Sequence, residues 1–171
     1  VPDLNGRHYL KYIGKNAFAE MDRLTEIVLP YSVIDIDIGA FEDCSNLKYI
    51  FIPQAVRGIG ANAFAGCALL DIEFEVGSQL RYAEINSFSD TDWYVKQKDS
   101  QQNFVVAGRL IVEYVKKENQ NLVTLPTNAV AVRANLFAND TDLVTVEIHA
   151  AIEFIGDGAF YNCTSLINIE F

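Results

Sequence analysis

The chain has 171 residues, half of them hydrophobic, and its 23 acidic residues outnumber 13 basic ones to give a net charge of −10. An acidic surface repels phosphate groups, which argues against nucleic acid or anionic lipid as a partner. No apolar run approaches the ~20 residues that a membrane-spanning helix needs, so we expect no membrane insertion by this segment.

A short motif built around a phenylalanine recurs along the whole chain. One residue marks each copy, and these marker phenylalanines are Phe18, Phe41, Phe64, Phe88, Phe137 and Phe160. They are separated by 23, 23, 24, 49 and 23 residues, and the longest separation is close to two periods. A fixed period of this length indicates a solenoid, in which each repeat buries its apolar face only by stacking on its neighbours. The sequence therefore predicts one solenoid of about seven repeats over residues 1–171.

Each repeat is predicted to contain two extended segments and a turn. A Leu-x-x-Ile-x-Ile segment has the alternation of a short, half-buried strand, and Pro30, Pro53 and Pro126 follow such strands directly. A second extended segment occupies residues 33–36, 56–59, 130–132 and 152–155. It leads into Ala-Phe-x-x-Cys, whose spacing fits one or two helical or 3₁₀ turns with the Phe and the Cys inward. In the third repeat, Leu69 is taken as the inward leucine.

Residues 89–121 depart from this pattern. A polar run over 96–103 is followed by two β-rich segments, 104–106 and 110–115, on either side of Gly108. This arrangement predicts a hairpin or an irregular double repeat. We expect Trp93 to fill the core where the regular turn is lost.

The three cysteines occupy one position of the repeat. Cys44, Cys67 and Cys163 each follow a marker phenylalanine by three residues, where other copies have Met21, Thr91 and Asp140. A position that accepts such residues is typical of core packing, and no CxxC or Cys–His cluster is present. We therefore expect free, inert thiols, without a disulfide, a bound metal or a cofactor.

The sequence indicates no catalytic site. His8 and His149 are far apart along the predicted stack, and no Ser–His–Asp or Cys–His arrangement can be argued. Acidic pairs such as Asp90 and Asp92 are interpreted as a solvated surface rather than a Ca²⁺ site.

The candidate binding residues lie on the outward side of the first strand of each repeat, in two lanes. The first lane contains Glu26, Tyr49, Asp71, Thr145 and Asn168. The second lane contains Val28, Phe51, Glu73, Glu147 and Glu170. Because neighbouring strands lie ~4.8 Å apart, these lanes predict a continuous parallel-sheet surface roughly 30 Å long.

Tyr49 and Phe51 stand out within these lanes, because they place two aromatic rings on one strand beside carboxylates. Exposed aromatic residues with a polar rim are typical of protein interfaces. The alternative is a solvated sheet surface on which a neighbouring loop or another domain covers Phe51.

The pattern Ile-Gly-x-x-Ala-Phe-x-x-Cys-x-x-Leu-x-x-Ile-x-Ile-Pro resembles the BspA-like class of leucine-rich repeats over nearly the whole chain. The segment from Trp93-Tyr94 to Tyr114 is similar to an interruption common in that family. The resemblance implies a right-handed β/α(3₁₀) superhelix with short parallel strands. It also implies a cell-surface or secreted protein, associated with adhesion to a host matrix or cell-surface protein.

Two other functions stay open, a structural spacer and a carbohydrate-binding surface near Trp93. Because the chain begins at Val1 and ends within a repeat at Phe171, we expect it to be a piece of a longer protein. The identity of the ligand does not follow from these residues.

Overall fold

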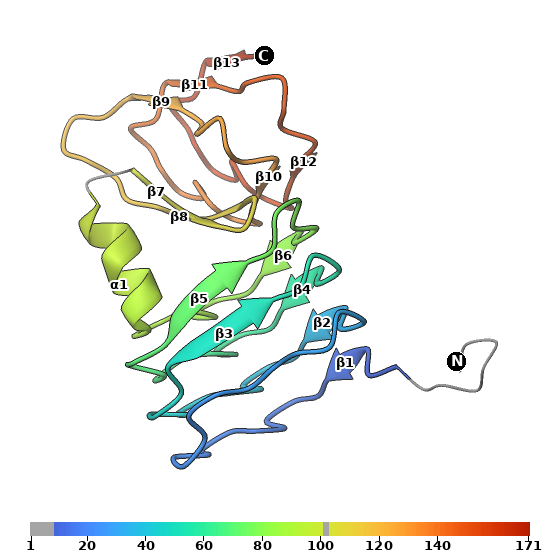
Figure 1. Ribbon diagram of the computed structural model, residues 1–171. Helices are drawn as coiled ribbons and strands as arrows, with labels where there is room; N and C mark the ends of the chain where they lie inside the picture. The colour runs from blue at the N-terminus through green and yellow to red at the C-terminus, as the bar shows by residue number, and fades with distance from the viewer. Residues whose placement is uncertain (1–8, 101–102) are drawn as a thin grey trace. The chain divides into compact units, whose positions relative to one another are not determined.

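The computed structural model describes residues 9–100 and 103–171, and the chain divides into two compact units. The N-terminal unit is Val1–Gln97 and the C-terminal unit is Lys98–Phe171. Each unit is a stack of coils joined by short parallel strands, which confirms the predicted repeat solenoid (Figure 1). That a single uninterrupted solenoid spans residues 1–171 stays a prediction. His8 lies outside the described residues.

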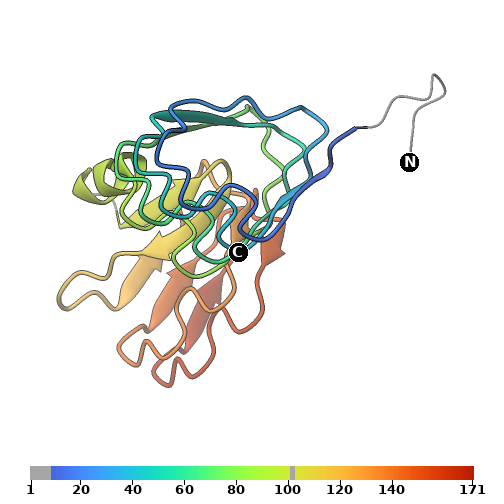
Figure 2. The same cartoon turned by 90° about the horizontal axis from the view of Figure 1, so that it is seen from below.

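Two parallel sheets build the N-terminal unit. One has the order β1 (Tyr12–Ile13), β2 (Asp35–Ile36), β4 (Gly58–Ile59) and β6 (Tyr82–Ala83). The other pairs β3 (Tyr49–Ile52) with β5 (Asp71–Phe74). The second extended segments of the repeats therefore form strands as predicted. Viewed along the stack, successive coils of this unit overlay one another (Figure 2).

Alternation along these strands places the aliphatic side chains in the core. Ile50 and Ile52 of β3 are fully buried, and Ile72 of β5 lies beside Ile50. The prediction for Leu69 was wrong: Leu70 is fully buried and Leu69 is 49% exposed. Leu70 follows Cys67 by the same three residues that separate Leu47 from Cys44, so the third repeat has the regular spacing.

Backbone hydrogen bonds join the turn around each marker phenylalanine to the next repeat. In the second repeat, the amides of Gly39, Phe41 and Asp43 donate to carbonyl oxygens of the following repeat at 2.8 to 2.9 Å. The amides between them bond within the turn in the i→i+3 pattern, as from Glu42 to Gly39. The predicted 3₁₀-like hydrogen bonds are thus present, and they alternate along the turn with hydrogen bonds to the neighbouring repeat.

Residues with positive φ interrupt these turns, so no continuous helix forms. Those two positions before the marker are Asn16, Gly39, Asn62, Asn86, Asn135 and Gly158. Those two positions after it are Glu20, Asp43, Gly66, Asp90, Asn139 and Asn162. Glycine, asparagine and aspartate are the residues that adopt this left-handed conformation most readily, and they fill nearly every such position.

The marker phenylalanines form the predicted aromatic spine. In the N-terminal unit, ring centroids are 5.2 Å apart for Phe18 and Phe41, 5.4 Å for Phe41 and Phe64, and 6.1 Å for Phe64 and Phe88. The planes of these neighbouring rings differ by at most 8°. In the C-terminal unit, Phe137 stacks on Phe160 at 5.1 Å. Parallel rings at these distances add to the free energy gained from burial.

The polar run over residues 96–103 starts inside a helix, α1 (Asp92–Asp99). Thr91 caps it, because its Oγ1 accepts a hydrogen bond from the amide of Tyr94, and Asp92 pairs with Lys96 one turn later at 2.6 Å. Trp93 is buried, with its ring centroid 5.2 Å from that of Phe88 and 5.7 Å from that of Phe74. The prediction that Trp93 fills the core is confirmed.

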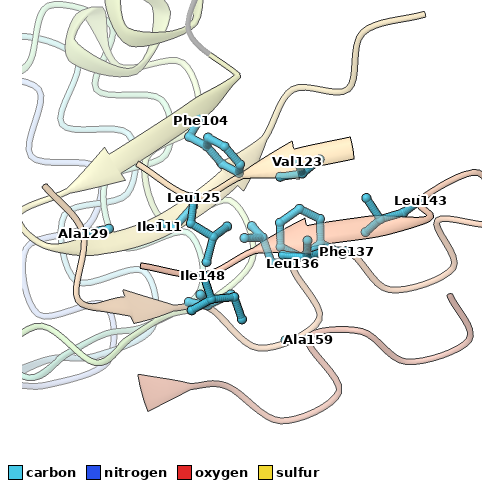
Figure 3. Packing of buried hydrophobic residues seen from close by; sticks show 12 residues of the cluster. Phe104, Ile111, Val123, Leu125, Ala129, Leu136, Phe137, Leu143, Ile148 and Ala159 are labelled. Carbon is cyan, nitrogen blue, oxygen red and sulfur yellow. The ribbon is translucent and has the colours of Figure 1, made fainter. Parts of the chain in front are cut away.

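The C-terminal unit begins with the predicted hairpin. Its antiparallel strands are β7 (Phe104–Ala107) and β8 (Leu110–Tyr114), and Gly108 in the turn has a φ of 60°. β8 continues into a sheet with β10 (Ala131–Val132) and β12 (Phe154–Ile155). A second, parallel sheet contains β9 (Leu122–Thr124), β11 (Thr145–Glu147) and β13 (Asn168–Glu170). Figure 3 shows buried side chains of both sheets, among them Ile111 and Val123, packing together with Phe137 of the turn between β10 and β11.

Tyr114 is a marker residue that the sequence analysis missed. Tyr114 precedes Leu122 of β9 by eight residues, and Phe137 precedes Thr145 of β11 by the same number. Because Leu122 and Thr145 are in register, Tyr114 occupies the position of a marker phenylalanine. Its ring centroid lies 4.9 Å from that of Phe137. The apparent double period between Phe88 and Phe137 therefore contains an aromatic spine residue, a tyrosine in place of phenylalanine.

Candidate binding face

The first strands of the repeats place the two lanes in register, as predicted. In the N-terminal unit, Tyr49 of the first lane is opposite Asp71, and Phe51 of the second lane is opposite Glu73. Glu26 forms an isolated bridge with Tyr49, which extends the first lane by one repeat. We call the surface formed by Glu26, Val28, Tyr49, Phe51, Asp71 and Glu73 the β3–β5 face.

Aromatic and aliphatic side chains gather on the β3–β5 face. Val28 is 91% exposed, Tyr49 is 45% exposed, and Phe51 is half-buried. The ring of Tyr31 meets that of Phe51 edge-on, with centroids 6.3 Å apart. Tyr31 therefore covers part of Phe51. Because Tyr31 is itself 71% exposed, it also enlarges the apolar patch.

Carboxylates border this patch. The hydroxyl of Tyr49 donates a 2.6 Å hydrogen bond to Glu73 Oε2, and this bond raises the pKa of Tyr49. Asp71 and Glu73 are exposed on β5, and Glu26 is exposed beside Tyr49. The bond fixes the Tyr49 ring across the two strands, so an approaching partner meets an ordered aromatic surface with negative charge at its edge.

The remaining lane residues belong to the sheet of the C-terminal unit. Thr145 is in register with Asn168, and Glu147 with Glu170. Strand β9 adds Leu122 and Thr124 to the same lanes, and the Thr124 hydroxyl donates to Glu147 Oε2 at 2.6 Å. This surface is polar, apart from Leu122, and has no aromatic residue in its lanes.

That the two lanes form one continuous surface across both units stays a prediction. Within the described residues, the lanes lie on two separate sheets, one formed by β3 and β5 and the other by β9, β11 and β13. Along the chain, α1 and the hairpin lie between these two sets of strands. Gly77 to Leu80 follow β5 in place of the usual proline turn. The sequence analysis also missed Tyr31, Leu122 and Thr124. The available signal was the register of Leu122 with Thr145, which places Leu122 in the first lane.

The N-terminal unit also has a cavity of about 290 Å³ over its other sheet. Tyr12, Asp35, Gly58 and Tyr82 are in register there. The Tyr82 ring lies against Gly58, and its hydroxyl donates to Asp35 Oδ1 at 2.5 Å. Burial and this hydrogen bond raise the pKa of Tyr82 to about 12. These residues hold three repeats together and lie outside the predicted lanes.

The cysteines are free and packed against the spine, as predicted. The thiol groups of Cys44, Cys67 and Cys163 donate to the carbonyl oxygens of Phe18, Phe41 and Phe137 at 3.0 to 3.1 Å. Burial raises the pKa of Cys67 to about 12 and raises the pKa of the other two thiols. A buried thiol with a raised pKa is a poor nucleophile.

His149 has a structural position. Its Nε2 lies 2.8 Å from the carbonyl oxygen of Pro126, and its Nδ1 accepts a hydrogen bond from the amide of Ala151. Both ring nitrogens are therefore engaged with the backbone. The described part of the chain contains no group of three or more side chains suited to hold a metal ion, and no helix in it is long and apolar enough to cross a membrane.

A family profile described as "BspA type Leucine rich repeat region" matches residues 4–97 and 113–171 in six copies. The second matched segment begins beside Tyr114, where the aromatic spine resumes. No curated protein matches the chain significantly.

Several solved leucine-rich repeat structures are similar to the chain. A leucine rich cell surface protein from Faecalibacterium prausnitzii is 21% identical with a TM-score of 0.47, over 95% of this chain and 51% of that one. A leucine-rich repeat protein from Bacteroides ovatus is 22% identical with a TM-score of 0.46, over 100% of this chain and 43% of that one. The leucine rich repeat protein of T. pallidum is 22% identical with a TM-score of 0.42, over 85% and 69%. The chain thus spans about half of the first relative's length, or less for the second.

Proposed function

The chain belongs to the BspA-type leucine-rich repeat family, and from that premise we propose that it is a non-catalytic binding module of a cell-surface or secreted protein. Its ligand is a host matrix or cell-surface protein, bound through the outward lanes. The family supports the surface location and the adhesive role, and the side chains of the lanes support the choice of a protein ligand.

The observation that carries the proposal is the aromatic patch on the β3–β5 face. Tyr49, Phe51 and Tyr31 present rigid rings beside the highly exposed Val28. Tyrosine is enriched among the residues that dominate binding energy, because it buries a large area at a low entropic cost. An apolar centre with a polar rim is the anatomy of a protein interface.

The rim indicates the chemistry of the partner. Glu26, Asp71 and Glu73 border the rings, and the whole chain has a net charge of −10. A partner with an apolar centre and basic residues around it therefore matches this face, because complementary charge accelerates association and disfavours acidic competitors. In the C-terminal unit, Thr145, Glu147, Asn168 and Glu170 supply polar contacts to the same kind of partner.

The ring of Trp93 is buried against Phe74 and Phe88, so it does not offer a surface on which a sugar could stack. A structural spacer is the remaining alternative. It requires no ligand on the lanes, which gives the experiment a clear second outcome.

The test is a binding array of matrix and cell-surface proteins, read with the wild-type chain and with Tyr49→Ser/Phe51→Ser. We expect a protein bound at micromolar concentration, and a loss of affinity of about tenfold or more in the double variant, because two central aromatic contacts are removed. Tyr161→Ser, which removes an exposed ring of the C-terminal unit outside the lanes, serves as the matched control.

The melting temperature of the double variant should stay close to that of the wild type, because both rings are partly exposed. Unchanged affinity in Tyr49→Ser/Phe51→Ser would remove the β3–β5 face as the binding surface. An array without any bound protein would favour the spacer.

A further inference from the structure

The sheet formed by β1, β2, β4 and β6 gives the N-terminal unit a second candidate surface (Figure 1). Tyr12, Asp35, Gly58 and Tyr82 are in register across this sheet. Because Gly58 has no side chain, the ring of Tyr82 can cross β4; a Cβ on Gly58 would lie 1.8 Å from a carbon of that ring. The Tyr82 hydroxyl thereby reaches Asp35 Oδ1, two strands away. Both tyrosines and Asp35 line the cavity of about 290 Å³.

The charge on the wall of this cavity is negative. Among the described residues, the carboxylates of Asp35, Asp37 and Glu84 line it, and no lysine or arginine does. Their printed partners are neutral donors, since Asp35 accepts from the Tyr82 hydroxyl and the other two accept from backbone amides. After burial and its hydrogen bond to Asp35, the charges of the three carboxylates also raise the pKa of Tyr82. The cavity therefore holds negative charge that no side chain on its wall neutralises.

The groups that face the cavity are accessible to a ligand. Asp37 and Glu84 are exposed. Asp35 Oδ2 has no hydrogen-bond partner in the described part of the chain, and it is not sealed from solvent. Tyr12 is 62% exposed and Tyr82 is 47% exposed, and within residues 9–100 neither ring pairs with another aromatic ring. A cation over the face of a tyrosine is attracted by the ring electrons, so the rings and the carboxylates favour the same kind of ligand.

The spacing of the charges and the size of the cavity indicate which cation fits. The described residues contain no group of three metal-ligating side chains, so the three carboxylates do not converge on one metal ion. A guanidinium group spreads its charge over a plane with five N–H donors and stacks on aromatic rings, whereas an ammonium group is a compact, strongly hydrated charge. The volume is just below the ~300 Å³ at which pockets for drug-sized ligands begin, which suits a single side chain.

We propose that this cavity binds an arginine side chain of a partner protein. The guanidinium group lies against the rings of Tyr12 and Tyr82, and its N–H groups donate to Asp35 and Glu84. The net charge of −10 attracts a basic segment toward the chain, and the carboxylates of the cavity fix its arginine in place. This site is on the other sheet of the unit, so it does not depend on the β3–β5 face.

The test is an NMR titration of the ¹⁵N-labelled chain with Nα-acetyl-L-arginine N-methylamide and with the corresponding derivatives of lysine and citrulline. Citrulline has nearly the shape of arginine without its charge. We expect the arginine derivative to shift the amide signals of Gly14, Asp37 and Glu84 in the millimolar range. The lysine derivative should bind more weakly, and the citrulline derivative should give no saturable shift.

Two variants test the two parts of the site. Tyr12→Leu removes one aromatic face and should weaken binding of the arginine derivative about two- to fivefold, the effect of one exposed cation–π contact. Asp35→Asn/Glu84→Gln removes two charges but keeps an oxygen that can accept from Tyr82. It should weaken binding about fivefold or more, because two ion pairs with the guanidinium group are lost.

Two controls separate the cavity from the charge of the whole chain and from the other face. Asp22→Asn/Asp90→Asn removes the same charge at exposed positions outside the cavity, and salt screens such distant charges, so binding should be unchanged. Tyr49→Ser/Phe51→Ser should also bind the arginine derivative like the wild type. Because Tyr12 is largely exposed, Tyr12→Leu should keep the melting temperature of the wild type, and its result is independent of any effect of Asp35 on folding.

Four results would overturn the proposal. Without a shift of these amides by the arginine derivative, the cavity binds no such side chain. Equal affinity for the citrulline derivative would mean that charge is not recognised, and tighter binding of the lysine derivative would mean that the guanidinium group is not. If Asp22→Asn/Asp90→Asn loses as much affinity as Asp35→Asn/Glu84→Gln, only the net charge of the chain acts.

Discussion

Two residues of each regular repeat, the marker phenylalanine and the cysteine three positions later, act on the same neighbour. Phe41 stacks on Phe18 and Phe64 with nearly parallel rings, and Cys44 donates to the carbonyl oxygen of Phe18. The sequence predicts the burial of both residues from their spacing. The hydrogen bond of the thiol was not predictable in this way, because packing alone accounts for a small buried residue.

The buried thiols make stability depend on alkaline pH. Burial raises the pKa of Cys67 from 9.0 to about 12, so the folded chain holds this proton where the unfolded chain releases it. The stabilisation is fully present below pH 9.0 and is lost as the pH rises toward about 12. We expect the urea midpoint to fall across this window, and to fall less steeply in Cys67→Ala. Equal slopes for the two proteins would contradict the buried, protonated thiol.

Among the elements, the turn that follows the second strand of the repeat depends on a close backbone approach. A Cβ on Gly60 would lie 2.5 Å from the backbone nitrogen of Ile38, and one on Gly156 would lie 2.4 Å from that of Ala134. No side chain fits in this space without separating the repeats. Packing between neighbouring turns therefore requires glycine at these two positions, whereas Asp37, Glu84 and Arg133 occupy the same place in other repeats.

Gly60→Ala should destabilise the fold by about 1–3 kcal/mol, as overpacking of a tight contact does. Gly14→Ala is the matched control, because it has the same place in its repeat and a Cβ there meets no described atom within 4 Å. It should be neutral or slightly stabilising. Urea unfolding of the two variants measures both effects, and equal stability of the two would refute the close approach.

The elements also show what sequence periodicity can and cannot predict. Strand positions and their register follow from alternation, because a shift by one residue would expose every isoleucine. The choice of Leu69 over Leu70 was wrong because both residues suit a buried site, and only their distance from Cys67 distinguishes them. Helix α1 was missed because it is mostly polar and has no apolar face that periodicity could reveal. Its signals in the sequence are the Thr91 cap and the pair of Asp92 with Lys96.

On the scale of the whole molecule, the candidate face has one part in each unit, and α1 and the hairpin lie between the two parts along the chain. The lanes were predicted residue by residue, and their registers are confirmed within each sheet. Their continuity from one unit to the other stays a prediction. The aromatic patch was predicted in part: Tyr49 and Phe51 follow from alternation, whereas Tyr31 lies after the strand and is placed by its contact with Phe51.

The central claim is that the repeats stack in register around an aromatic spine, and ring-to-ring NOEs in a chain with selectively labelled phenylalanine and tyrosine test it most directly. The stack predicts contacts from Phe18 to Phe41, Phe64 and Phe88 in that order, and from Tyr114 to Phe137 and Phe160. A marker ring without an NOE to its predicted neighbour, or with one to a ring two repeats away, would contradict it.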